Sequence, residues 1–172
     1  MSVQVFNPKS HKLNFSFSYN NDETSLLRKD LKDKENVDSN DLRRVSLWKL
    51  DRVLSVSDET LECIRTVVKM KELRVDSDCS KKAIEMLVNS QGIGFPMASA
   101  ILKFLRPDVF PIIDVRAYRA LEGKKLSYAA YTLDKYIAYT KKLTDLANTL
   151  KLPLSEIDEQ LYCFDKAKNG KI

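Results

Sequence analysis

The residues best suited to chemistry in this chain are a glycine turn and an aspartate that follows it. Gly92-Ile93-Gly94 is expected to form a sharp turn with exposed amides, because glycine accepts positive φ and lets another backbone approach closely. Pro96 follows where a helix would begin, and exposed amides at a helix N-terminus favour a bound phosphate. Asp114 lies 22 residues after the first glycine. The pattern therefore indicates a phosphate-binding turn with a carboxylate at a fixed spacing, and points to nucleic acid.

The same stretch resembles the helix-hairpin-helix DNA glycosylase superfamily of base-excision repair. The similarity lies in the Gly-Ile-Gly turn, the Ala-x-x-Ile-Leu helix and the ending Phe110-Pro111-Ile112-Ile113-Asp114. The string FPIID followed by Arg119-Ala120-Leu121 is nearest the adenine-mismatch branch, which is monofunctional. The resemblance implies that the hairpin binds the DNA backbone and that Asp114 is catalytic. It covers residues 91–121, under a fifth of the chain, so it indicates a superfamily better than a substrate.

The chain departs from that family at two points. Pro96 occupies the position where the bifunctional members carry their Schiff-base lysine, so the resemblance implies base release without strand cleavage. Many members hold an iron–sulfur cluster on four closely spaced cysteines, whereas Cys63, Cys79 and Cys163 are scattered and are expected to be reduced thiols. His11 is the only histidine, which excludes a histidine-based metal site or a Ser-His-Asp triad. We therefore expect no cofactor, no iron–sulfur cluster and no metal.

Composition predicts a small helical protein. The chain has 172 residues, 44% of them hydrophobic, with only 4 glycines and 5 prolines. This favours an all-α fold, a helical bundle of two small lobes forming a single domain over residues 1–172. Without a long apolar run or a signal-like N-terminus, we expect a cytoplasmic protein that does not enter a membrane.

The charge balance suits a polyanion. The net charge is +5, and residues 92–125 hold 6 basic against 3 acidic side chains, whereas the flanking segments are nearly balanced. The excess therefore concentrates on the motif. We expect double-stranded DNA as the partner and a monomeric protein.

Periodicity places the motif between helices. Residues 1–20 alternate apolar and polar side chains, which predicts an extended arm or a short β-hairpin. Helical spacing is found near 23–33, 41–54 (capped by Ser39 or Asn40), from 57, 78–90, 97–105, 115–121, 132–150 and from 155. The helices at 78–90 and 97–105 would be the two arms of the hairpin.

Basic side chains around the motif have two interpretations. Lys103, Arg106, Arg116 and Arg119 are most simply a solvated basic face. The functional interpretation places some of them, with Lys103 and Arg116 as our choice, on DNA phosphates beside Gly92, Ile93, Gly94 and Pro96. Such contacts provide affinity and position but no sequence information.

Aromatic side chains could form a base pocket. Trp48 is the only tryptophan and stands beside Lys49 and Arg52. In the simpler interpretation, Trp48 packs in the core and the two cations reach solvent. In the more specific functional interpretation, Trp48 is a stacking surface for an extruded base. The tyrosines after the motif are mostly expected to pack, although one could line a pocket; they are Tyr118, Tyr128, Tyr131, Tyr136 and Tyr139.

Three functions stay open at this stage. Asp114 precedes a helical segment, so it could be an N-cap, a catalytic carboxylate or both. The first function is a monofunctional DNA N-glycosylase, the second a non-catalytic helix-hairpin-helix DNA-binding module, and the third a protein-interaction domain that keeps only the fold. A concave pocket beside Asp114, on the face of the hairpin, would favour the first.

Overall fold

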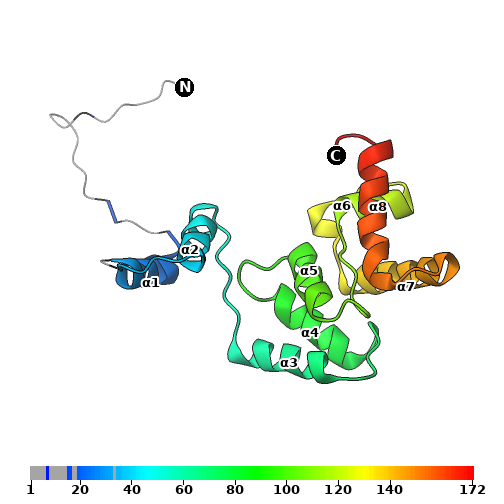
Figure 1. Ribbon diagram of the computed structural model, residues 1–172, viewed down its shortest axis with the longest axis horizontal. Coiled ribbons are helices and arrows are strands. Elements are labelled where there is room, and N and C mark those ends of the chain that lie inside the picture. The colour runs from blue at the N-terminus through cyan, green and yellow to red at the C-terminus, as the bar shows by residue number, and fades with distance from the viewer. Residues whose placement is uncertain (1–6, 8–14, 17–18, 33) are drawn as a thin grey trace. The chain divides into compact units, whose positions relative to one another are not determined.

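The computed structural model describes residues 7, 15–16, 19–32 and 34–172 (Figure 1). The chain divides into two compact units, residues 1–53 and 54–172. The predicted N-terminal arm or β-hairpin lies almost wholly outside the described residues.

The prediction of an all-α fold is confirmed. The described part of the chain contains helices and no β-strand. No helix within it has the length and apolar character that crossing a membrane would require. In chain order the elements are α1 (Asn21–Leu31), α2 (Ser39–Lys49), α3 (Asp58–Lys69), α4 (Asp78–Val88), α5 (Phe95–Leu105), α6 (Val115–Glu122), the 3₁₀ turn η1 (Tyr128–Ala130), α7 (Leu133–Leu150) and α8 (Leu154–Lys168).

Local capping explains where α2 differs from the prediction. Asp38, rather than Ser39 or Asn40, is the N-cap, because its carboxylate accepts from two amides while the Asp41 side chain accepts from the Asp38 amide. This reciprocal arrangement is a capping box. The helix ends at Lys49 instead of residue 54, and Asp51 has a positive φ of 55° that helical continuation does not allow.

Unit 1 is a pair of helices joined by polar contacts. The Trp48 indole N–H donates to Thr24 Oγ1 at 2.8 Å, and its ring meets the edge of Tyr19 at 5.1 Å between centroids. Arg44 on α2 forms an ion pair with Glu23 on α1 at 3.1 Å. These contacts hold α1 against α2.

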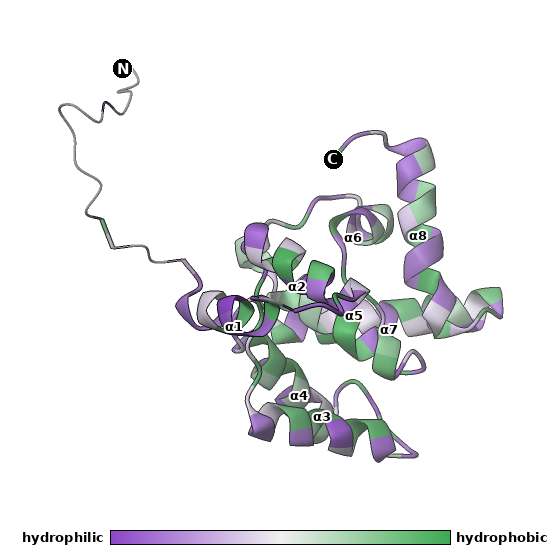
Figure 2. Ribbon diagram, turned by 60° about the vertical axis from the view of Figure 1, so that its left-hand side comes forward, coloured by the Kyte–Doolittle hydropathy of each residue, from purple (hydrophilic) through white to green (hydrophobic). Residues whose placement is uncertain are grey.

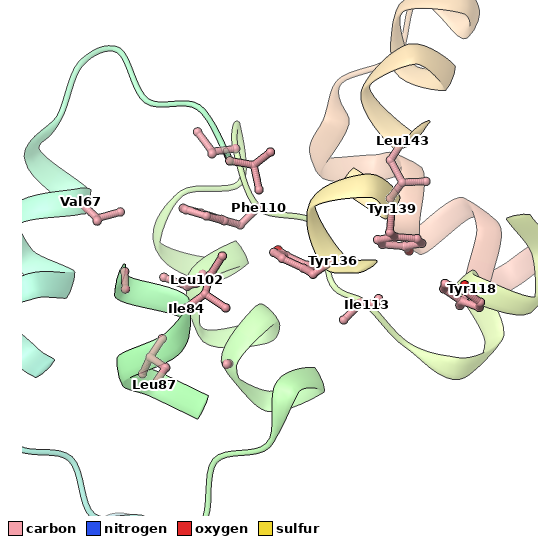
Figure 3. Close-up of a cluster of buried hydrophobic side chains, with 14 of the residues drawn as sticks. Val67, Ile84, Leu87, Leu102, Phe110, Ile113, Tyr118, Tyr136, Tyr139 and Leu143 are labelled. Atoms are coloured by element: carbon pink, nitrogen blue, oxygen red, sulfur yellow. The ribbon is translucent and has the colours of Figure 1, made fainter. Parts of the chain in front are cut away.

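The core of unit 2 lies among amphipathic helices, in which hydrophobic and hydrophilic residues alternate (Figure 2). Figure 3 shows two groups of buried side chains. Helices α3, α4 and α5 with the segment after α5 supply one, and α6 and α7 supply the other. Tyr136 and Ile113 lie between the groups. The buried residues labelled there are Val67, Ile84, Leu87, Leu102, Phe110, Ile113, Tyr118, Tyr136, Tyr139 and Leu143.

Helix α6 is fixed to α8 through a buried carboxylate. The two helices lie side by side (Figure 1). Asp165 on α8 is fully buried and accepts from Arg119 Nε at 2.7 Å and from Arg116 Nη1 at 3.1 Å. Asn169 donates a further hydrogen bond to it at 2.8 Å. These contacts of Asp165 form the α6–α8 ion-pair network. Because Asp114 precedes α6, this network also helps to position Asp114.

The stability that the α6–α8 ion-pair network contributes should depend on pH. Arg119, with smaller contributions from Asn169 and Arg116, holds the pKa of Asp165 well below its usual range. A carboxyl whose folded pKa is depressed stabilises the fold above its unfolded pKa of about 4, and this contribution is lost as pH falls below that value. We expect Asp165→Asn to lower Tm at neutral pH and to flatten its decline between pH 7 and pH 3. Thermal unfolding followed by circular dichroism measures both. Asp145→Asn, at an exposed site on α7, is the control; equal pH profiles for wild type and Asp165→Asn would contradict the assignment.

Candidate functional site

Two helices joined by a short glycine turn occur where the hairpin was predicted. Helix α4 ends at Val88 and α5 begins at Phe95. Gly92 has φ 79°, the left-handed conformation that favours glycine, and Gly94 is the N-cap of α5. Pro96 lies in the first turn of α5, where the loss of its N–H costs nothing.

The turn exposes backbone amides at the start of α5. Among the described residues, the amides of Gly92, Gly94 and Phe95 find no backbone acceptor, whereas Ile93 donates to the Ser90 carbonyl at 3.2 Å. Free N–H groups at a helix N-terminus favour an anion. These amides therefore have the hydrogen-bonding capacity that the sequence predicts for this turn.

The η1 turn returns the chain to the hairpin. A Cβ atom built on Gly94 would first meet the hydroxyl oxygen of Tyr128, in close contact. The Tyr128 ring in turn lies against Tyr131 with centroids 6.4 Å apart and planes inclined at 67°. The sequence alone places Tyr128 only in a general tyrosine-rich region, because two helices and two loops separate Tyr128 from Gly94.

Asp114 is the N-cap of α6, so its predicted capping role is confirmed. Oδ1 accepts from the amides of Arg116 at 2.8 Å and Ala117 at 2.9 Å. Oδ2 accepts no hydrogen bond from the described part of the chain. The preceding amide, of Ile113, donates to Ser99 Oγ on α5 at 3.1 Å. One carboxylate oxygen is thus fixed and the other is available to a ligand.

Two buried tyrosines fix the extended segment that leads to Asp114. The Tyr136 hydroxyl donates to the Pro111 carbonyl at 2.8 Å, and the Tyr139 hydroxyl donates to the Ile112 carbonyl at 3.1 Å. Burial raises the pKa of both tyrosines well above the usual range, so each hydroxyl stays protonated and keeps donating. Both are core residues, as expected for most tyrosines here.

A buried ion pair holds the other side of that segment. The Ile112 amide donates to Asp158 Oδ2 at 3.0 Å. Lys103 Nζ lies 2.8 Å from Asp158 and 2.7 Å from Glu159, and the lysine is only 5% exposed. The predicted phosphate contact at Lys103 does not fit this burial, because its ammonium is enclosed by two carboxylates. We therefore leave Lys103 out of the proposed DNA-binding surface.

The other cations near the motif also make internal contacts. Arg106 is buried and donates to two carbonyls of the α3 C-terminus as well as to Asp108. Arg116 and Arg119 hold Asp165. The interpretation of these side chains as a solvated basic face is therefore wrong, because each has carboxylate partners far along the chain or in the next turn. Arg116 keeps a partly exposed guanidinium, so its DNA contact stays a prediction.

A pocket of about 280 Å³ opens beside Asp114 between α6 and α8. Its size is near the lower end of ligand pockets, about 300 Å³. Burial raises the pKa of Asp158 there, even though Lys103 acts in the opposite direction. No hairpin residue contributes to its lining, which consists of Ile112, Asp114, Ala117, Asp158, Glu159, Tyr162 and Cys163.

The predicted base pocket at Trp48 belongs to unit 1. Trp48 is half-buried and its indole contacts Thr24 and Tyr19, while Lys49 and Arg52 are exposed. This arrangement corresponds to the simpler interpretation, packing with the cations in solvent.

The comparisons with known proteins add no family. No protein-family model, curated protein or solved structure matches the chain. Within the described residues, no three or more cysteine, histidine or acidic side chains are grouped so that they could hold a metal ion. The fold and the site around Asp114 are therefore the basis for assigning function.

Proposed function

We propose that this protein binds double-stranded DNA through the hairpin and hydrolyses the N-glycosidic bond of a damaged or mispaired base. The observation that supports it best is the position of Asp114. Its Oδ1 is fixed by two amides, its Oδ2 is available, and a pocket opens beside it. A carboxylate held this firmly at a pocket suits the stabilisation of a developing positive charge.

The chemistry follows from a single carboxylate. The target base would leave the stack, at a cost that is lowest for a damaged or mispaired base. As the bond from C1′ to the base nitrogen breaks, its electron pair leaves with the base and positive charge builds on the sugar. Asp114 would stabilise this charge and take a proton from the water that adds to C1′, as carboxylates do in sugar hydrolysis. With Pro96 in place of a lysine, the product would be an abasic site in an uncut strand.

A substrate screen tests the proposal. Duplexes carrying different lesions and mispairs are incubated with the protein and then treated with alkali, which cleaves at abasic sites. Strand cleavage that requires alkali is the expected result for at least one duplex. Cleavage without alkali would contradict the monofunctional assignment, and no cleavage of any duplex that the protein binds would favour the alternative below.

The alternative is a non-catalytic helix-hairpin-helix module that only binds DNA. Two observations favour it: Asp114 already has a structural role as the N-cap of α6, and the hairpin does not line the pocket. In that function the pocket would have no substrate, and DNA affinity would not depend on Asp114.

DNA binding should depend on the hairpin glycine. Gly92→Val should weaken duplex binding several-fold and leave helicity intact, because a β-branched residue at φ 79° distorts the turn that presents the amides. Fluorescence anisotropy over a range of salt concentrations measures this, and wild-type affinity should fall steeply with salt. Gly170→Val is the matched control, since Gly170 also has a positive φ, of 67°, but lies beyond α8 with open space around it. Equal affinities for wild type and Gly92→Val across all salts would refute the claim.

A further inference from the structure

The loop that joins α6 to α7, residues 123–131, combines exposed cations with exposed aromatic surface. Leu126 is buried and anchors the loop to the core. On either side of it Lys124, Lys125 and Tyr128 are exposed, and neither lysine forms an ion pair in the described part of the chain. They differ in this from the cations near the motif, which have internal partners. The loop therefore presents uncompensated positive charge beside an aromatic ring.

Tyr128 exposes far more aromatic surface than a packing residue does. Its side chain is 77% exposed, and its ring contact is the edge-type contact with Tyr131. Aromatic rings usually bury most of their large apolar area, so a ring left this open has a face free to receive another flat ring. A nucleobase offers a complementary flat face, and stacking on tyrosine tolerates any base.

The loop reaches the hairpin part of the proposed site. Tyr128 contacts the hairpin at Gly94, as described above. Its ring is therefore beside the turn whose amides are proposed to bind a phosphate. A strand whose phosphate is bound at the hairpin amides would have a base within reach of the Tyr128 ring.

Resting on the DNA binding proposed above, we propose that Tyr128 is a stacking surface for an unpaired nucleobase, with Lys124 and Lys125 on the neighbouring phosphates. The preferred substrate class is then DNA with at least one base outside the duplex stack, as in a bulge or a single-nucleotide gap. A paired base presents no free face to the ring, so intact duplex would engage the hairpin alone.

Ring and hydroxyl have separable roles. Stacking needs the ring, whereas a hydrogen bond to a phosphate on the hairpin needs the hydroxyl. Tyr128→Phe keeps the first, and Tyr128→Ala removes both. Phe104→Ala removes another exposed aromatic ring of the same unit, one that is 86% exposed at the far end of α5. It lies about 15 Å along the helix axis from the hairpin and is the matched control.

Anisotropy titrations of two fluorescein-labelled duplexes test the proposal, one fully paired and one with a single unpaired 2-aminopurine. Wild type should bind the second at least about fivefold more tightly, the effect of one base–aromatic stack. It should also quench the 2-aminopurine fluorescence. Tyr128→Ala should lose the preference and the quenching, and it should bind the paired duplex as Tyr128→Phe does, because both variants lack the hydroxyl. Tyr128→Phe and Phe104→Ala should keep both.

The outcomes separate this inference from the proposed function. Equal binding of the two duplexes by wild type, or a preference that survives in Tyr128→Ala, would overturn the stacking role and leave hairpin binding to duplex DNA unaffected. Loss of the preference in Phe104→Ala as well would assign it to general exposed apolar surface and overturn it too. Wild type that binds neither duplex overturns both.

Discussion

Asparagine in place of Asp114 should reduce base release by about a hundredfold or more while the fold and DNA binding persist. Asparagine lacks the negative charge that would stabilise a sugar cation, but its side-chain oxygen can still accept from Arg116 and Ala117. It is also a good N-cap, so α6 should lose little stability. Single-turnover assays on the best substrate of the screen, with anisotropy on the same duplex, measure the two effects separately.

Alanine at the same position is the structural control. Asp114→Ala removes both the charge and the cap, so it should lower the free energy of unfolding by about 1 kcal/mol in addition to abolishing base release. If Asp114→Asn released base as fast as wild type, Asp114 would be a cap only. The non-catalytic module would then be the better account.

Methionine in place of Lys103 should destabilise the protein by about 3–5 kcal/mol, the usual cost of removing one partner of a buried ion pair. Asp158 would be left buried with a charge that backbone amides, among them that of Ile112, offset without any cation. Urea denaturation followed by circular dichroism measures the difference. The loss should be smaller at acid pH, because burial already raises the pKa of Asp158 and a protonated carboxyl needs no cation.

Two further variants define the origin of that loss. Lys166→Met changes an exposed lysine of α8 and should leave the free energy of unfolding within about 0.5 kcal/mol of wild type. The double variant Lys103→Met, Asp158→Leu should recover part of the stability, since it leaves no unpaired charge. A single variant as stable as wild type would mean that the ion pair contributes nothing.

Local signals predicted the helices and the hairpin well. Capping residues and the glycine turn act over a few residues, so α6 begins after Asp114 as expected, and α7 begins at Leu133, one residue after the predicted start. The sequence could not show that Lys103 pairs with a carboxylate 55 residues away. A single lysine in an apolar helix is expected to reach solvent with its long side chain, and only the fold shows that α8 encloses it.

The candidate site was predictable only in part. Spacing and resemblance identified Asp114 and Gly92, but the pocket beside Asp114 is made mostly by α8, which carried no motif. The contact of Tyr128 with the hairpin could not be predicted either, because only the fold places η1 at Gly94. Contacts between residues distant in sequence produce no periodic pattern in the sequence from which they could be predicted.

The hydrogen bonds that hold the segment before Asp114 determine when that segment becomes fixed during synthesis. The hairpin helices are complete once α5 has emerged, whereas the segment donates one of its hydrogen bonds to Asp158 on α8. Domains generally fold as units, and the hairpin and α8 belong to the same unit. A growing chain would thus have the segment before Asp114 fixed only after α8, the last helix of that unit, has been made. Under the proposed function, a chain that stops before α8 should release no base.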